Sequence, residues 1–292
     1  MGRTIIEDMI MKEVDRLLAK ANESIKTGNK DFQLSSIVEI CIGSIINQIL
    51  LGYRFIGETE QEFYEIKNIM TKGIQIRGNP LATIVMFYPR VLKHLPYFRD
   101  YWKELNEAGQ IFQDFISKQI SSQLETFKLE GSPEEATNFG EAFFIEMHRR
   151  EQNGDTNEFN LLQLRNLLID LWIAGQETTT NTTNFGILYL LTHPEAQAKM
   201  QMELDKTIGN ERRVTLADRS DLPYTNAVIN ETQRLCNLLP QNVLHYTTKD
   251  VVINGYKIAK GTTIAPQISC LLYDKDVCKS IVYRHKQQFD IL

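Results

Sequence analysis

The sequence predicts a mostly α-helical protein with a small β region near its C-terminal end. Up to about residue 237, apolar residues recur every three or four positions, which is the period of a helix with one buried face. After Leu238-Leu239-Pro240 the pattern changes to short runs of β-branched and aromatic residues, separated by residues typical of turns. These two patterns, one after the other along the chain, define the fold class.

Eight helices are expected in the first part of the chain. Each has helical apolar spacing, and Gly, Pro, Asn or Ser residues interrupt the pattern between many of them. No internal repeat or low-complexity linker divides this part. The helices are expected near residues 4–27, 33–51, 58–73, 99–129, 134–153, 159–191, 194–208 and 223–237.

The β region is expected to contain short strands joined by tight turns. Asn254-Gly255 stands between two β-rich runs and is a strong hairpin signal. Lys260-Gly261 marks a further turn. The β-rich runs cover residues 243–248, 251–253, 256–258 and 262–264.

Composition excludes several classes of protein. The chain has 292 residues, 42% of them hydrophobic, which is ordinary for one large or two moderate globular domains. A net charge of −5 and the lack of any Lys/Arg cluster argue against a nucleic-acid surface. Because the four cysteines show no C-x-x-C spacing, neither a zinc site nor a disulfide framework is expected.

The sequence also lacks the usual signals for membrane insertion or export. No run reaches the roughly 18 apolar residues that a membrane span needs. Acidic Glu7 and Asp8 follow the first apolar residues at once, which is unlike a secretory signal. The chain as given is therefore expected to be cytoplasmic and to contain no membrane span.

The helix expected at 159–191 has an unusual centre. Asn160 predicts its N-cap, yet its middle reads Gln-Glu-Thr-Thr-Thr-Asn-Thr-Thr-Asn from residue 176, where a domain-crossing helix is normally apolar. Four residues with little side-chain bulk, flanked by an acid, are expected to share one face. They are Ala174, Gly175, Thr178 and Thr179, with Glu177 as the acid.

Two interpretations of this centre remain open on the pattern alone. In the first, the small residues let a flat ligand approach the helix, while Glu177 and Thr178 form an acid–alcohol proton relay. In the second, the threonines donate back to the carbonyls four residues earlier, and Glu177 lies at a wet edge of a structural helix.

A second feature is an E-x-x-R quartet, Glu231 to Arg234, on the last predicted helix. Such a quartet alone is weak evidence, since Glu146 to Arg149 forms another one and i, i+3 ion pairs are usually surface contacts. The order of features is more specific. An acid–alcohol helix is followed by a short helix, Leu-Pro-Tyr, E-x-x-R and an Asn-Gly hairpin.

This order resembles the cytochrome P-450 superfamily, most closely its animal microsomal members. The resemblance runs from Met1 to about Asp276 and implies a truncated form of the P-450 fold. It identifies Ala174 to Thr179 with the oxygen-activation motif of the family's long central helix. By this resemblance Glu177 feeds protons and Thr178 holds oxygen or a water molecule. Ala174, Gly175 and Thr179 are then expected to lie against the haem.

The resemblance assigns roles in the C-terminal part as well. His245 matches a position that contacts a haem propionate in similar proteins. Glu231 and Arg234 match the structural E-x-x-R pair of the family. The implied activity is that of a haem-thiolate monooxygenase, which inserts one oxygen atom of O₂ into a lipophilic substrate and releases the other as water.

The resemblance also implies partners and a location. NADPH-cytochrome P-450 reductase, a flavoprotein, is expected to supply two electrons, and haem iron is the expected cofactor. Proteins of this type reside in the endoplasmic reticulum membrane. No nucleic acid is expected as a partner.

The sequence departs from the family pattern at both ends. The family's membrane anchor and first strands are expected to be missing before Met1. The Phe–Gly–Arg–Cys–Gly loop that supplies the axial thiolate is not found, and Cys278 has no flanking glycine. No metal ligand is therefore assigned. Residues 1–276 are expected to be a partial P-450 domain, and residues 277–292 a divergent tail.

Three functions stay open at this point. The first is an incomplete monooxygenase. The second is a catalytically inactive truncated isoform, or a fragment produced by the gene model, in which haem is not retained. The third is a helical module that binds lipophilic molecules and uses the apolar segment 81–87 as a lid.

Overall fold

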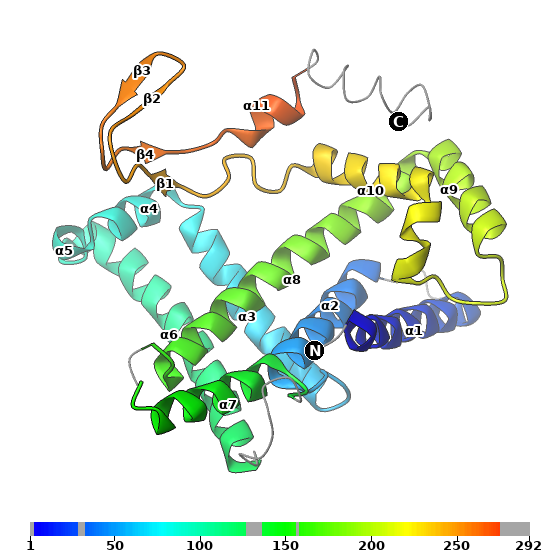
Figure 1. The fold of residues 1–292 in the computed structure, drawn as a ribbon, viewed down its shortest axis with the longest axis horizontal. Helices are drawn as coiled ribbons and strands as arrows, with labels where there is room; N and C mark the ends of the chain where they lie inside the picture. The colour runs from blue at the N-terminus through cyan, green and yellow to red at the C-terminus, as the bar shows by residue number, and fades with distance from the viewer. Residues whose placement is uncertain (1–2, 29–32, 127–135, 156–157, 275–292) are drawn as a thin grey trace. The chain divides into compact units, whose positions relative to one another are not determined.

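The computed structural model describes residues 3–28, 33–126, 136–155 and 158–274, and the chain divides into two compact units. The first unit ends at Thr180 and the second begins at Asn181. This boundary falls inside the longest helix, α8 (Leu161–Thr192), so α8 contributes to both units. Figure 1 shows the elements coloured in chain order. The predicted tail, residues 277–292 with Cys278, lies outside the described residues.

Within the described ranges, the first unit consists of α1 to α7 and the first part of α8, up to Thr180. α1 packs against α2, and α3 packs against α6, while α2 also contacts α3, α6 and α7. The mostly helical fold class is confirmed. The helices are α1 (Arg3–Thr27), α2 (Leu34–Leu51), α3 (Thr59–Arg77), α4 (Pro80–Phe87), α5 (Pro89–Leu92), α6 (Pro96–Thr126) and α7 (Phe139–Gln152).

The hydrophobic core of the first unit is rich in aromatic rings. The indole of Trp172 on α8 is fully buried and packs edge-on against Phe112 of α6, with ring centroids 5.4 Å apart. Phe63 of α3 lies on another side of the same indole, at 6.5 Å. Because α8 contributes its largest side chain to this cluster, the core fixes the rotation of α8 about its axis.

Helix α2 is long and apolar enough to cross a membrane by length and composition, which the sequence reading did not anticipate. It is the one such helix within the residues that the structure describes. More than half of it is buried inside the protein, as in a core helix of a globular fold. Its apolar character is thus used for packing against α1, α3, α6 and α7.

A buried charge network joins α1 to the segment after α2. The carboxylate of Glu13 is 1% exposed and accepts hydrogen bonds from Arg54 at 2.5 Å and from Arg16 at 3.2 Å. Arg16 also donates to Glu60 of α3 at 2.5 Å. A carboxylate removed from water needs such partners, so the network holds α1, α2 and α3 in register.

The region from 74 to 98 differs from the sequence expectation. α3 continues to Arg77, four residues beyond its expected end, and two short helices precede α6. The side chain of Asn79 caps α4 by accepting from the Leu81 N–H at 2.9 Å. α4, α5 and α6 each begin with proline, whose fixed φ suits the first helical position. Proline was interpreted only as a break, so these starts were missed.

α7 begins at Phe139, later than the expected residue 134. Asn138 adopts an extended backbone, and its side chain accepts from the Glu141 N–H at 2.9 Å. Glu141 in turn accepts from the Thr137 N–H at 2.8 Å. This reciprocal cap fixes the start of the helix. The expected end of the preceding helix at 129 lies outside the described residues.

The second unit joins helices to two small antiparallel pairs of strands. β1 (His245–Tyr246) pairs with β4 (Thr263–Ile264), and β2 (Val251–Ile253) pairs with β3 (Tyr256–Ile258). The small β region is thus confirmed, although its strands have two or three residues each. The helices are α9 (Pro194–Thr207), the 3₁₀ helix η2 (Leu216–Asp221), α10 (Pro223–Cys236) and α11 (Ile268–Leu272).

The turn between β2 and β3 is the predicted Asn-Gly hairpin. Asn254 and Gly255 both have positive φ, +49° and +84°, as a two-residue type I′ turn requires. α11 was not expected, since no helix was predicted after residue 237. The Tyr273 hydroxyl donates to the Leu235 carbonyl at 3.0 Å, which ties the end of α11 to α10.

Candidate functional site

The orientation of the central motif is set by one buried stripe on α8. Its members are spaced four residues apart, so they lie on one face of the helix. The stripe begins with apolar side chains and ends with polar ones, and each of these residues is at most 1% exposed. It comprises Leu164, Leu168, Trp172, Gln176 and Thr180.

Gln176 is the member that sequence reasoning missed. Its Nε2 donates to the Glu39 carbonyl of α2 at 2.9 Å and to Thr180 Oγ1 at 3.3 Å. A polar side chain with no exposed surface needs such partners. The signal was present in the sequence, because position 176 continues the apolar spacing of 164, 168 and 172. Gln176 thus anchors the motif to α2.

Gly175 lies against α2. A Cβ at this position would stand 2.9 Å from Ile46 Cδ1, closer than real Cβ atoms approach other heavy atoms. Gly175 therefore lets α2 and α8 pack closely. Gly175 lies about 60° from Thr178 around the helix axis, so the two residues are neighbours on α8, but Ile46 of α2 lies against Gly175.

Ala174 and Thr178 form an exposed row on the opposite side of α8 from Gln176. Both residues are exposed, and so is Thr179. Thr178 Oγ1 donates to the Ala174 carbonyl at 2.7 Å, the back-bonding that the structural interpretation of the motif predicted. This row presents a methyl group and a hydroxyl oxygen, with no large side chain between them.

Glu177 is held by a partner from another helix. Its carboxylate forms an ion pair with the Lys67 amine of α3, 110 residues earlier in the chain. The Lys67 side chain is 11% exposed and that of Glu177 is 24% exposed. The acid of the motif therefore lies in a partly desolvated pair, rather than at the wet edge of the structural alternative.

In the second unit, Glu231 and Arg234 of α10 form a bidentate pair. The guanidinium donates to the two carboxylate oxygens at 2.8 and 2.6 Å. Arg234 also donates to the Leu272 carbonyl at 2.8 Å, so it joins α10 to α11. The pair is mostly buried, with side-chain exposures of 16% and 21%.

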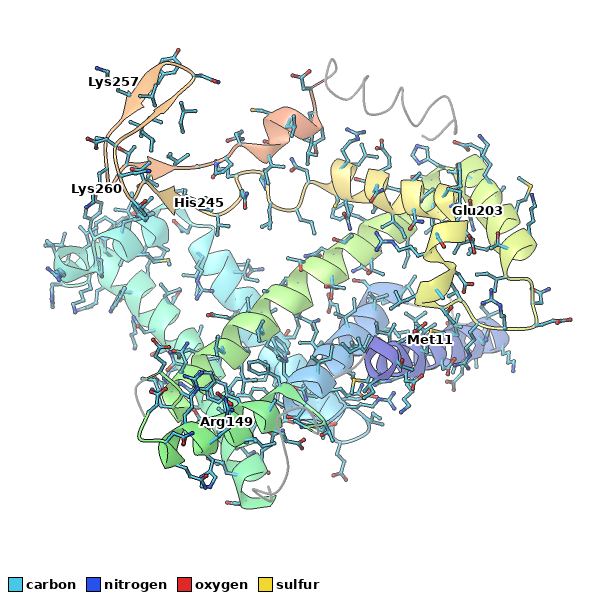
Figure 2. The ribbon with its side chains drawn as sticks, viewed as in Figure 1. Met11, Arg149, Glu203, His245, Lys257 and Lys260 are labelled. Carbon is cyan, nitrogen blue, oxygen red and sulfur yellow. The ribbon has the colours of Figure 1, made fainter. Side chains whose placement is uncertain are left out.

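The other E-x-x-R quartet has the same geometry and a different setting. Arg149 donates to Glu146 at 2.8 and 2.9 Å on α7, but the Arg149 side chain is 65% exposed. Figure 2 labels Arg149 on the first unit. The two quartets differ in burial and in the carbonyl contact to α11, which the sequence spacing alone does not reveal.

α10 has a further anchor that sequence reasoning missed. Glu203 of α9 accepts hydrogen bonds from the Tyr224 and Thr225 N–H groups at 2.8 and 2.7 Å, and from the Thr225 hydroxyl at 2.8 Å (Figure 2). A carboxylate at a helix N-terminus satisfies free N–H groups and favours the helix dipole. No local spacing signals this cap, since its partners lie more than 20 residues away.

His245 is the exposed first residue of β1, and its cross-strand partner is Ile264 (Figure 2). The hairpin beside it is fixed by Asp250, which accepts from the Lys260 N–H at 2.7 Å. His245, Glu231 and Arg234 belong to the second unit, whereas Ala174 to Thr179 belong to the first. The structure thus joins Glu231 to Arg234 within the second unit and keeps Ala174 to Thr179 on one stretch of α8 in the first.

The described cysteines differ in exposure. Cys41 is buried in α2, where its thiol donates to the Glu13 carbonyl and burial raises its pKa to about 11. The thiol is therefore protonated near neutral pH. Cys270, in contrast, is exposed on α11.

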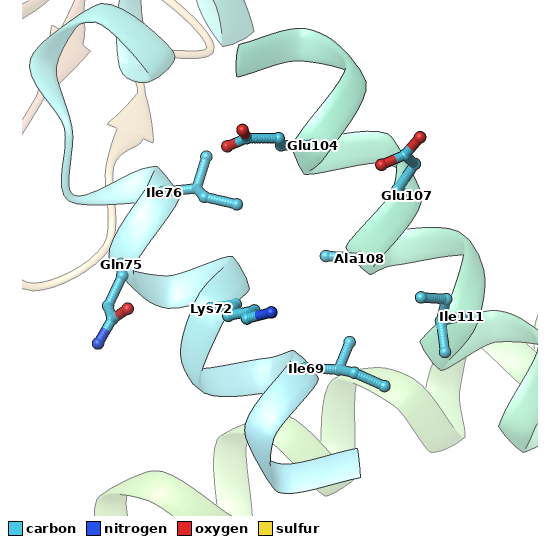
Figure 3. A pocket seen from close by; sticks show the side chains of 8 residues that line it. All are labelled: Ile69, Lys72, Gln75, Ile76, Glu104, Glu107, Ala108 and Ile111. Carbon is cyan, nitrogen blue, oxygen red and sulfur yellow. The ribbon is translucent and has the colours of Figure 1, made fainter. Parts of the chain in front are cut away.

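A groove of about 460 Å³ lies between α3 and α6 (Figure 3). Isoleucines and Ala108 form its walls, while Lys72, Glu104 and Glu107 bring both signs of charge to it. The segment 81–87 of the proposed lipophile-binding module does not line this groove.

These sites define a class of protein. It is a helical protein with an acid–alcohol motif in its long central helix and a mostly buried E-x-x-R pair. Comparison with known families makes the assignment. The chain belongs to the cytochrome P450 family, whose family model matches residues 2–280.

Curated relatives support this assignment. The chain is 32% identical over 290 residues to cytochrome P450 2H1 of Gallus gallus, covering 99% of this chain and 55% of that protein. It is 30% identical over 276 residues to cytochrome P450 2J5 of Mus musculus, covering 94% and 52%. Cytochrome P450 2A13 of Homo sapiens is 31% identical over 274 residues, covering 94% and 53%. The chain thus spans about half the length of the curated relatives it matches.

Family membership implies a haem cofactor, and one surface of the first unit meets its steric requirement. A flat macrocycle needs a helix face without bulky side chains, and the exposed row of Ala174 and Thr178 offers such a face. Thr178 adds a hydroxyl oxygen there. The residues of α8 therefore fit haem on this side.

Proposed function

We propose that this protein is an incomplete form of a cytochrome P450 monooxygenase, an enzyme that inserts one oxygen atom into a lipophilic substrate, with residues 1–276 as a partial P450 domain and 277–292 as a divergent tail. The observation that carries the proposal is that two opposite faces of α8 have different roles. One face anchors the helix through the buried side chains of Trp172 and Gln176, and the opposite face exposes Ala174 and Thr178. Glu177 stands beside Thr178 in the sequence, in a fixed ion pair.

Haem, when bound, supplies the redox chemistry that activates O₂. The residues proposed to lie against it are Ala174, Thr178 and Thr179, and His245 is proposed to contact a propionate. Gly175 contributes indirectly, because it sets the distance between α8 and α2.

Glu177 and Thr178 are the proposed proton-handling groups. The Thr178 hydroxyl donates its hydrogen to the Ala174 carbonyl, and a hydroxyl oxygen in this arrangement acts toward a water molecule or a protonated ligand as an acceptor. The Glu177 carboxyl group is the proposed acid and base, which gives a proton to a water molecule held by the Thr178 hydroxyl and takes one back from solvent. Glu231 and Arg234 act at a distance by holding α10 and α11 together.

The proposed partners are NADPH-cytochrome P450 reductase and a lipophilic small molecule, at the endoplasmic reticulum membrane. Seven large hydrophobic side chains are exposed between residues 84 and 97, which supports contact with an apolar phase. They are Ile84, Met86, Phe87, Tyr88, Val91, Leu95 and Tyr97.

The test is turnover of the expressed protein with the reductase, NADPH and isotopically labelled O₂. A monooxygenase puts one labelled oxygen atom into each product molecule. A red-shifted Soret band of the carbon monoxide complex would show in addition that a cysteine of this chain, to none of which that role is assigned, binds the haem iron. Product oxygen that comes from water would contradict the proposal. A chain that takes up no haem would favour the catalytically inactive form.

A further inference from the structure

Three consecutive residues of the motif are each held by a different neighbour. Gly175 lies against Ile46, Gln176 donates to the Glu39 carbonyl, and Glu177 pairs with Lys67. At about 100° per residue, Gly175 and Glu177 lie on opposite flanks of the stripe that contains Gln176. α2 therefore covers one flank, and α3 supplies the contact on the other.

The pair between Lys67 and Glu177 has the features of a positioning contact. An exposed glutamate samples many rotamers, and a surface ion pair holds it weakly. Here the lysine is nearly buried, so screening by salt is reduced and loss of the amine leaves a carboxylate in a partly desolvated place. Lys67 thus restricts where the Glu177 carboxylate can lie.

We propose that Lys67 is a positioning residue, which keeps the Glu177 carboxylate on the α3 side of α8, next to the exposed row of Ala174 and Thr178. Without the amine, the carboxylate turns away from this row, and proton transfer to a water molecule held by the Thr178 hydroxyl slows. This inference rests on the proposed function, since it assigns Lys67 to the same proton path.

The first experiment needs no haem. The ¹³C signal of the Glu177 carboxyl is followed by NMR in the full chain and in three variants. Lys67→Met is expected to shift the signal, and Lys67→Arg is expected to keep it near the wild-type position. Lys72→Met is the matched control, because Lys72 lies on the same helix and is exposed. A signal that does not respond to Lys67→Met would overturn the proposal.

The second experiment measures turnover in the haem-loaded protein. Lys67→Met is expected to lower kcat about ten-fold with little change in KM, since a general acid–base group contributes at least this much. Lys67→Arg should retain most of the activity. An unchanged kcat in Lys67→Met, beside an active wild type, would reduce the pair to a structural contact and overturn the proposal. Wild-type protein that binds haem and does not turn over would instead contradict the proposed function.

Discussion

Arg234 donates two hydrogen bonds to the Glu231 carboxylate and a third to the Leu272 carbonyl. One guanidinium therefore holds the Glu231 side chain in place and also joins α10 to α11. Planar bidentate geometry of this kind is specific to arginine, because an ammonium group cannot reproduce it. The contact joins residues 38 positions apart and holds α11 against α10.

Arg234→Lys is therefore expected to destabilise the second unit by about 2 kcal/mol, since a mostly buried carboxylate loses part of its pairing. Urea unfolding measures the change. Arg149→Lys is the matched control, because Arg149 is 65% exposed and Glu146 also pairs with Arg150, so this quartet should tolerate the substitution. Equal losses in the two variants would show that burial and the Leu272 contact do not matter.

Glu203→Gln is expected to cost about 1–2 kcal/mol, because the N-terminus of α10 loses a charged cap. Hydrogen exchange at the Tyr224 and Thr225 amides should accelerate in this variant, since both donate to Glu203. Glu211→Gln, an exposed loop residue, serves as the control. Unchanged exchange at the two amides would contradict the assigned cap.

Much of this fold was predictable from the sequence, because local signals determine helix existence. Periodic apolar spacing located α1, α2, α8 and α10 to within a few residues, and Asn254-Gly255 located the β hairpin. The short helices between residues 80 and 92 were missed, since proline can start a helix as well as stop one.

The site was less predictable, because its partners are distant in sequence. The motif residues follow one another along α8, yet Lys67, Ile46 and Glu39 come from other helices. A single sequence contains no signal that pairs Glu177 with Lys67. The contact of Gly175 with Ile46, beside the exposed Ala174 and Thr178, likewise follows from the packing of α2.

Gly175→Ala is expected to destabilise the first unit by about 1–3 kcal/mol, because its Cβ would overlap with Ile46 Cδ1. Adding Ile46→Val removes that atom and should recover part of the loss. Gly186→Ala on the same helix is the control. Its Cβ would meet Thr232 at an ordinary 3.4 Å, so a gain of up to about 1 kcal/mol in helix stability is expected. Thermal unfolding of the three variants distinguishes a packing role for Gly175 from a purely ligand-facing one.

The buried thiol of Cys41 is expected to lower the free energy of unfolding at alkaline pH. Burial raises the pKa of this thiol from 9.0 to about 11, so the folded state retains a proton that the unfolded state releases. The contribution to stability is complete below about pH 9 and is lost as the pH rises toward 11. Urea unfolding at pH 8 and pH 10.5 should show a smaller decrease in Cys41→Ala than in the wild type. Equal decreases would assign the effect to other groups, such as Tyr53, whose pKa burial also raises.

The central claim is that Thr178 lies at an oxygen-activation site, and the hydrogen peroxide released per NADPH consumed tests it most directly. Thr178→Ala and Thr192→Ala are compared, since both threonines are exposed and donate to the carbonyl four residues earlier on α8. We expect peroxide release to rise on the order of ten-fold in Thr178→Ala alone, with product falling in proportion. Equal peroxide yields in the two variants would contradict the assignment of Thr178 to the reaction.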